Sequence, residues 1–260
     1  MTTSIATPVR DDRAAVDKAV SLLLAFEDQT GAGLGVSELA RRAQLSKSTA
    51  FRVLGMLERN GVVERIGTGY RLGARLHQLG ASVYSPECER LRDLLLPYLT
   101  DLYESTHHTV HLAARYDSEV VYLAKLYGHR TVAVPSRIGG RLPAHCTAVG
   151  KALLAYRTDP GGPVTEPRRM TPHSVTDPVR LADELSVVRR TGIAYEEQES
   201  RLGVSCMAAP VFDGSSRAVA AFSIAGRHGQ LDTRRLEPVL RRICAAASKI
   251  AGRAQPVRVP

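Results

Sequence analysis

The chain has 260 residues, of which 44% are apolar and 23% are charged, so it can bury a substantial core and is expected to divide into two domains. This composition excludes collagen-like and wholly disordered chains. No window approaches the roughly 18 unbroken apolar residues of a membrane span, and the N-terminus lacks the charged-then-apolar order of a signal peptide. We therefore expect a cytoplasmic protein.

The formal net charge is +9, and its basic residues are concentrated in one segment. Between residues 41 and 75, eight Lys and Arg residues stand against two Glu residues, which favours an anionic partner. The four cysteines are Cys88, Cys146, Cys206 and Cys244. They are far apart and include no CxxC pair, so the pattern predicts reduced thiols rather than disulfides or structural zinc.

The N-terminal part of the chain predicts an arm followed by a helix. Residues 1–14 carry no apolar period and are expected to form a flexible arm, whereas apolar residues recur at helical spacing over residues 16–27. A glycine-rich string at residues 31–35 then breaks the helix. This string follows a helix rather than a strand, so we expect a loop and not a dinucleotide-binding turn.

Two short helices are predicted next, each with a serine at its start. Ser37 is expected to cap a helix that runs to about Gln44, and Ser46 is expected to cap a helix over residues 47–59. The reason is that a serine hydroxyl at this position accepts a hydrogen bond from a free N–H of the first turn. Because only Leu45 and Ser46 separate the helices, they must cross as a helix-turn-helix.

Two short strands, over residues 62–66 and 70–72, are predicted around a glycine hairpin at residues 67–69. They form a wing, so residues 15–85 are predicted to be a winged helix-turn-helix. An amphipathic stretch over residues 86–106 predicts a linker helix that leads to a second domain.

Residues 107–255 are predicted to form an effector-binding domain of mixed structure. Alternating apolar residues indicate strands, and capped amphipathic stretches indicate helices. The expected strands lie within residues 109–124, 193–195, 204–212 and 218–224, and helices are expected after Thr147, after Asp177 and around Leu236. The fold class is therefore α+β, with an antiparallel-rich, sensor-type (GAF-like) second domain.

The start of the second helix of the helix-turn-helix carries the candidate DNA contacts. A helix fits the DNA major groove, and in this motif residues near its N-terminus reach base edges. Arg52 is the expected base-reading residue, because a guanidinium can bridge guanine O6 and N7 in two bonds. Taken singly, four of the arginines are equally well explained as solvated charges: Arg41, Arg42, Arg59 and Arg75. The candidates are Lys47, Ser48, Thr49 and Arg52 for the bases, and Arg41, Arg42, Arg65 and Arg71 for phosphates.

Five segments of this sequence are similar to the IclR family of bacterial transcriptional regulators: residues 36–40, 45–54, 69–73, 142–155 and 203–211. The resemblance extends over about residues 16–254. It implies a dimeric or tetrameric DNA-binding repressor or activator whose second domain binds a small metabolite. Gln44 departs from the pattern, since the family usually has glycine there. If that backbone position needs a positive φ, glutamine costs about 1 kcal/mol.

The resemblance also implies an effector cavity, which is lined by the loop before the Thr147 helix and by side chains of two strands. The free N–H groups at the start of a helix attract anions, so a small organic acid is expected. Ala225 stands where the family often has a second serine, which favours a larger or more apolar ligand. The candidates are Gly140, Leu142, Ala144, His145, Cys146, Glu196, Cys206 and Ser223.

Two other patterns are weaker. Gly150 and Lys151 suggest a phosphate-binding loop, but Ala152 stands where Ser or Thr should hold magnesium. A histidine string at residues 107–111 suggests a metal site, but it falls where a helix passes into a strand. We expect surface or hinge histidines there, and no metal or cofactor.

Two further classes of function remain as alternatives to a ligand-responsive DNA-binding regulator. A thiol-dependent hydrolase would use Cys146 or Cys206 with His145, but no residue is predicted to orient the base. A protein-interaction module with a degenerate winged helix would bind its partner without salt dependence. An enzyme would leave the winged helix unexplained, so we expect a regulator and not an enzyme.

Overall fold

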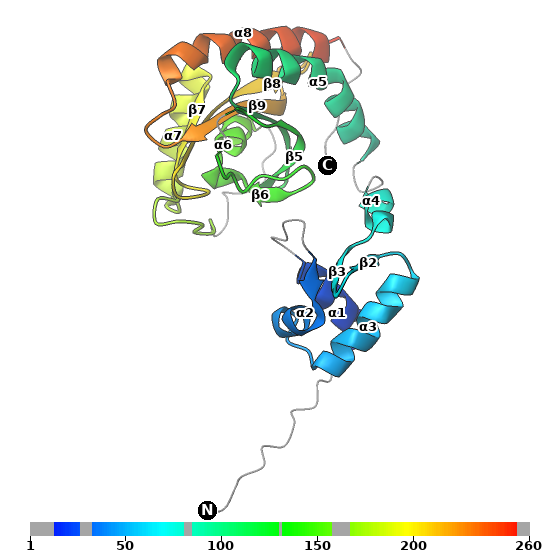
Figure 1. The fold of residues 1–260 in the computed structure, drawn as a ribbon. Helices are drawn as coiled ribbons and strands as arrows, with labels where there is room; N and C mark the ends of the chain where they lie inside the picture. The colour runs from blue at the N-terminus through cyan, green and yellow to red at the C-terminus, as the bar shows by residue number, and fades with distance from the viewer. Residues whose placement is uncertain (1–12, 27–32, 81–84, 130–131, 158–166, 254–260) are drawn as a thin grey trace, which may run out of the picture. The chain divides into compact units, whose positions relative to one another are not determined.

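The computed structural model of this chain describes residues 13–26, 33–80, 85–129, 132–157 and 167–253 (Figure 1). It divides into two compact units, Met1–Val83 and Tyr84–Pro260. Most of the predicted N-terminal arm lies outside the described residues. Within the described ranges, no helix is both long and apolar enough to cross a membrane.

The first unit is a small helical domain with a three-stranded antiparallel sheet (Figure 1). Its helices are α1 (Ala15–Leu24), α2 (Val36–Arg42), α3 (Lys47–Arg59) and α4 (Ala74–Gly80). Its strands, in the order β1-β3-β2, are β1 (Leu34–Gly35), β2 (Val63–Ile66) and β3 (Gly69–Leu72). The predicted hairpin is therefore confirmed as a wing. The two-residue β1 and the short α4 were not predicted.

The helix-turn-helix forms around a glutamine with left-handed backbone. Ser46 caps α3 as predicted, since its Oγ accepts a hydrogen bond from the Thr49 N–H at 3.2 Å. The prediction that Ser37 caps α2 is wrong, because Gly35 is the N-cap and Ser37 lies inside the helix. Gln44, in the turn, has φ 54°. This is the positive φ at which glutamine is expected to cost about 1 kcal/mol.

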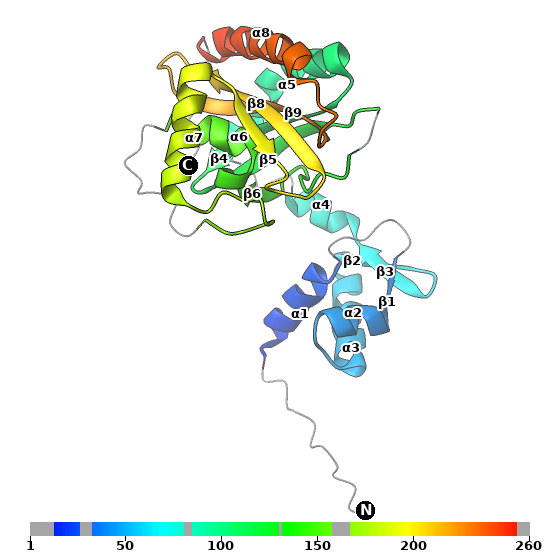
Figure 2. The same cartoon turned by 90° about the vertical axis from the view of Figure 1, so that its left-hand side faces the viewer.

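The second unit is a six-stranded antiparallel sheet with helices on both faces (Figure 2). Its strands, in the order β6-β5-β4-β9-β8-β7, are β4 (Thr109–Tyr116), β5 (Glu119–Leu126), β6 (Arg141–Pro143), β7 (Ala194–Glu197), β8 (Val204–Phe212) and β9 (Ala218–Arg227). One face packs against α5 (Pro86–Thr106) and α8 (Thr233–Ala251). The other packs against α6 (Ala148–Leu154), which follows the 3-10 turn η1 (Ala144–Cys146), and against α7 (Pro178–Thr191).

Helix α5, predicted as a linker, is part of the core of the second unit. Leu91, Leu95, Leu99 and Leu102 are each at most 1% exposed, and they pack with residues of the sheet and of α8. Their spacing places them on one side of the helix, which explains the amphipathic pattern. The segment that follows the winged domain is thus fixed by packing to the second unit.

Candidate DNA-binding surface and effector pocket

The start of α3 presents polar and basic side chains outward from the first unit. Lys47, Ser48 and Arg52 are exposed, and Thr49 is partly exposed, whereas the opposite side of α3 is buried in the core. The Ser46 Oγ donates to Thr49 Oγ1 at 2.8 Å, which orders the hydroxyls of this turn. In the described part of the chain, neither Lys47 nor Arg52 has an acidic partner. Both charges are available to a ligand.

Arg41 and Arg42, the first two candidate phosphate contacts, share one carboxylate. Glu38 accepts hydrogen bonds at 2.7 Å from both guanidinium groups, and these bonds lower the pKa of Glu38 to about 2. Arg42 also donates to the Ala25 carbonyl oxygen at 3.3 Å. These pairs are exposed, so exchanging the carboxylate for a phosphate costs little.

The wing carries the other two candidates. Arg71 donates to Glu64 at 2.7 Å, across the β2-β3 pair. The guanidinium carbon of Arg65 lies 5.8 Å from the ring centroid of Tyr70, over its face. Of the four candidate phosphate contacts, three therefore have an acidic neighbour, in contrast to the two basic residues at the start of α3.

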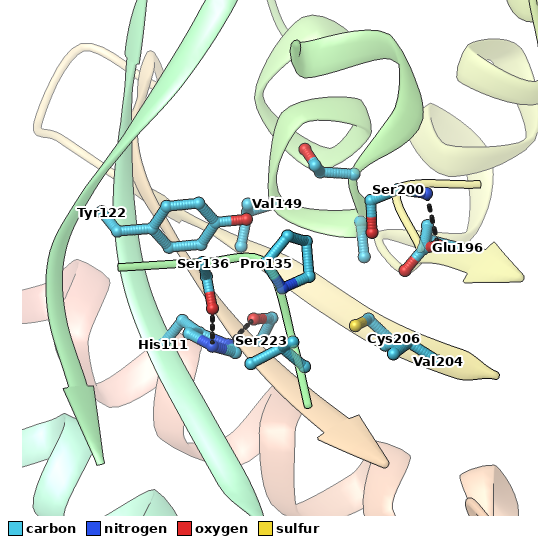
Figure 3. A pocket seen from close by; sticks show the side chains of 13 residues that line it. His111, Tyr122, Pro135, Ser136, Val149, Glu196, Ser200, Val204, Cys206 and Ser223 are labelled. Atoms are coloured by element: carbon cyan, nitrogen blue, oxygen red, sulfur yellow. Dashed lines mark hydrogen bonds between the residues drawn. The ribbon is translucent and has the colours of Figure 1, made fainter. Parts of the chain in front are cut away.

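A small pocket lies in the second unit, between the sheet and the start of α6 (Figure 3). It has an empty volume of about 310 Å³, including the part open to solvent. The lining residues come from β4, β5, β7, β8 and β9, the start of α6, and two loop segments. They are His111, Tyr122, Val134, Pro135, Ser136, Thr147, Ala148, Val149, Glu196, Ser200, Val204, Cys206 and Ser223.

A buried histidine organises one wall of the pocket. The Nδ1 of His111 lies 3.0 Å from Ser223 Oγ, and its Nε2 lies 2.8 Å from Ser136 Oγ (Figure 3). Burial, with a smaller effect of the nearby Lys125 ammonium, lowers the pKa of His111 to about 3, so the ring is neutral. A neutral imidazole has one donor and one acceptor, and both are used here.

The prediction of a surface or hinge position is wrong for His111, which is only 3% exposed. The alternation of side chains along the strand could have predicted that His111 is buried. Val110 and Leu112 face the α5 and α8 core, so His111 must point to the opposite face of the sheet, where the pocket lies.

Glu196 provides the other polar wall. It is 1% exposed, and its Oε1 accepts hydrogen bonds from the N–H groups of Glu199 at 2.6 Å and Ser200 at 3.0 Å. Its Oε2 is buried without a hydrogen-bond partner among the described residues. Burial raises the pKa of Glu196 to about 7. At neutral pH this carboxyl group can therefore either donate or accept a hydrogen bond.

Of the candidate effector contacts, Glu196, Cys206 and Ser223 line this pocket and the loop residues do not. Ala144 is fully buried under α6, and its backbone lies so close to Gly150 that a Cβ there would be 2.1 Å from the Ala144 carbonyl oxygen. The other loop candidates that lie outside the pocket lining are Gly140, Leu142, His145 and Cys146. Instead, Thr147 and the first residues of α6 line the pocket.

Lys151 is buried and forms ion pairs within the protein. The Gly150-Lys151 pair therefore has a structural role that needs no bound phosphate. Its Nζ lies 2.5 Å from Glu199 Oε1 and 2.6 Å from Glu184 Oε2, and its side chain is 2% exposed. Glu199 is also the residue whose N–H holds Glu196. This ion cluster therefore ties α6 and α7 to the wall of the pocket.

The thiols do not form a nucleophilic site. Burial raises the pKa of Cys146 to about 12 and that of Cys206 well above its ordinary value, so both remain protonated. His145, the base that a hydrolase would need, places Nε2 3.0 Å from the Arg168 carbonyl oxygen. The geometry gives the hydrolase alternative no support.

A winged helix-turn-helix with a basic recognition helix, followed in the same chain by a sensor domain with a polar pocket, defines a ligand-responsive DNA-binding regulator. Comparison with family models places the chain within this class. The IclR helix-turn-helix domain matches residues 15–67, and the bacterial transcriptional regulator IclR C-terminal domain matches residues 88–252. The chain belongs to the IclR family of bacterial transcriptional regulators.

Individual relatives agree with this assignment. The HTH-type transcriptional regulator KdgR of Escherichia coli K12 is 31% identical over 248 residues, which cover 93% of this chain and 92% of that protein. The transcriptional repressor IclR of the same organism is 27% identical over 212 residues, covering 78% and 77%. These relatives are transcriptional regulators and not enzymes.

Solved structures confirm the α+β fold with a helix-turn-helix and a GAF-like domain. The Thermotoga maritima IclR structure has a TM-score of 0.73 and 28% identity, and the match covers 91% of this chain and 98% of that one. An IclR homolog from Microbacterium hydrocarbonoxydans, crystallised with 4-hydroxybenzoate, has a TM-score of 0.73 and 27% identity, covering 93% and 100%.

Proposed function

We propose that this regulator binds an operator through α3 as a homodimer or homotetramer, and binds a small organic acid in the pocket around Glu196. The exposed start of α3, where Lys47 and Arg52 have no acidic partner in the described residues, carries the DNA-binding part. A protein that binds bacterial operators works in the cytoplasm, where the DNA is. Paired subunits place two recognition helices in successive major grooves, so the operator has near-palindromic half-sites about one helical turn apart.

The basic residues have two roles in this proposal. Arg52 reads a base, because a guanidinium in the major groove can make two hydrogen bonds to guanine, and Lys47, Ser48 and Thr49 contact neighbouring base edges. Arg41, Arg42, Arg65 and Arg71 contact phosphates and make the affinity depend on salt. Arg41 and Arg42 pair with Glu38, and Arg71 pairs with Glu64. These ion pairs are exposed, so exchanging the carboxylate for a phosphate costs little.

The effector part rests on the chemistry of the pocket wall. None of the described residues that line it is Lys or Arg, so an acid is held by hydrogen-bond donors rather than by an ion pair. Burial keeps the Tyr122 hydroxyl protonated by raising its pKa, and the partly protonated Glu196 supplies a second donor. The Microbacterium relative was crystallised with 4-hydroxybenzoate, which supports a small organic acid as the ligand of this pocket.

Selection of binding sites from random duplex DNA by the full chain tests the DNA-binding part. We expect an enriched near-palindromic site and a binding constant that falls steeply as salt rises. Enrichment of no sequence at low salt would refute it. The effector part is then tested by titrating benzoate, hydroxybenzoate and short keto-acids and measuring both binding and operator affinity. Acids that bind without changing operator affinity would refute the coupling of the two sites.

A further inference from the structure

Phe51 is an exposed aromatic side chain on the recognition helix that the proposed function does not use. The chain has four phenylalanines. Phe26 and Phe222 are at most 3% exposed and Phe212 is partly buried, whereas Phe51 is 55% exposed. A single exposed apolar residue is common on protein surfaces, so its exposure alone has no meaning. Its position in α3 is what requires an explanation.

The neighbours of Phe51 make an apolar spot within a basic surface. Lys47 lies one helical turn before it and Arg52 follows it, and both are exposed. One turn after it stands Gly55, where an added Cβ would have only Arg59 Nη1 within 4 Å, at 3.9 Å. The helix face beyond the ring is therefore open, and a flat or bulky partner can approach the ring there.

We propose that Phe51 contacts the C5-methyl group of a thymine and selects that base in the operator. Of the four bases, only thymine presents a methyl group in the major groove, and apolar side chains recognise it by direct contact. Lys47 and Arg52 beside the ring carry charge complementary to DNA, which favours DNA over an apolar protein surface as the occupant. The inference rests on the proposal that α3 enters the major groove.

Replacing thymine with deoxyuridine tests this directly, because the two bases differ by the methyl group alone. The probe is the site that the wild-type chain selects from random DNA, with each thymine replaced in turn. At one thymine in each half-site, we expect the wild type to lose about fourfold in affinity, from the exposure of one methyl group. Phe51→Ala should bind the two DNAs equally, and Phe51→Leu should retain part of the difference.

Met56→Ala is the matched control, since Met56 is a 38% exposed apolar residue of the same helix. This variant should keep the wild-type preference for thymine. If the wild type binds every deoxyuridine probe as tightly as the thymine probe, the inference is overturned and the DNA-binding proposal stays intact. Failure of the wild type to select any DNA would overturn the proposed function itself. A Phe51→Ala variant that keeps the wild-type preference for thymine would also overturn the inference. This holds whether or not sedimentation shows that the subunits of the variant dissociate.

Discussion

Glu196 and Gln44 each hold a charge state or a conformation that folding alone does not favour. The Glu196 carboxyl group is buried with one oxygen unpaired, and the Gln44 backbone is left-handed. Each has a cost that the rest of the fold must offset, and each can be tested by a substitution that removes the cost. Strained or unsatisfied groups of this kind concentrate at functional sites. Glu196 lies in the pocket and Gln44 lies next to the recognition helix.

Glu196→Gln is expected to stabilise the protein at pH 8 and to have little effect at pH 5. The pKa of Glu196 is about 7 in the native state against an ordinary value of 4.5, so the native state holds a proton that the unfolded chain has lost. Stability therefore falls as pH rises from about 4.5 to about 7. The gain at pH 8 should be on the order of 3–4 kcal/mol, at about 1.4 kcal/mol per pKa unit.

Thermal unfolding at the two pH values measures this effect. Glu104 is the control, because it is exposed on α5 and has no ion pair among the described residues, so its change to Gln should leave the pH dependence nearly unchanged. An equal shift in Tm for Glu196→Gln at pH 5 and pH 8 would contradict the assigned charge state.

Gln44→Gly is expected to stabilise the first unit by up to about 1 kcal/mol, because glycine adopts a positive φ without the steric penalty of a side chain. The Arg13 Nη2 group donates a hydrogen bond to the backbone carbonyl oxygen of Gln44 at 2.7 Å, and this bond does not involve the side chain that the change removes. Urea unfolding of the full chain gives the measurement. Gln44→Ala serves as the control, since alanine keeps the penalty; a gain of the same size in that variant would show that strain is not the cause.

At the scale of whole elements, helix α6 joins the pocket to the rest of the second unit. Its first residues line the pocket, Gly150 allows its close approach to η1, and Lys151 connects it to Glu184 and Glu199. The periodicity of the sequence predicted this helix and its Thr147 cap, whose Oγ1 accepts from the Gly150 N–H at 3.1 Å. The ion cluster could not be predicted, because its members are distant in sequence.

Lys151→Met is expected to destabilise the second unit by about 3–5 kcal/mol at pH 8, since it leaves the buried Glu199 carboxylate without a cationic partner. The loss should be smaller at low pH, where Glu199, whose pKa is raised by burial, becomes neutral. The control is Arg180→Ala, which removes an exposed partner of Glu184 and should cost less than about 1 kcal/mol. Denaturant unfolding followed by circular dichroism measures the free energy of unfolding of both variants. Equal losses in Lys151→Met and Arg180→Ala would contradict this account.

The sequence predicted elements better than it predicted the pocket. Apolar periodicity gave the order of the main helices and strands, because burial on one side of an element repeats at a fixed spacing. It missed β1, which is two residues long and pairs with β3. In the pocket, Glu196, Cys206 and Ser223 were predicted through the family resemblance, whereas Ser136 was missed. Ser136 lies in a loop without periodicity, and only the fold brings it to His111.

At the scale of the whole molecule, DNA binding and effector binding should be separable by substitution. Arg52→Ala is expected to weaken operator binding about tenfold or more and to relax base preference, while leaving effector affinity unchanged. Glu196→Ala is expected to reduce effector affinity and to leave operator binding without effector unchanged. Fluorescence anisotropy for DNA and calorimetry for the effector give the two affinities. Loss of both activities in either variant, with the fold preserved by circular dichroism, would contradict this division.

The packing of α5 sets where this chain can be cut. A recombinant sensor fragment that starts at residue 107 would lack the helix that carries Leu91, Leu95, Leu99 and Leu102, and would leave the sheet face beneath it bare. Such a fragment should aggregate, whereas one that starts near residue 85 should fold and stay monodisperse. The same leucines mean that exchanging DNA-binding heads between relatives is best done ahead of α5, where no core has to be divided.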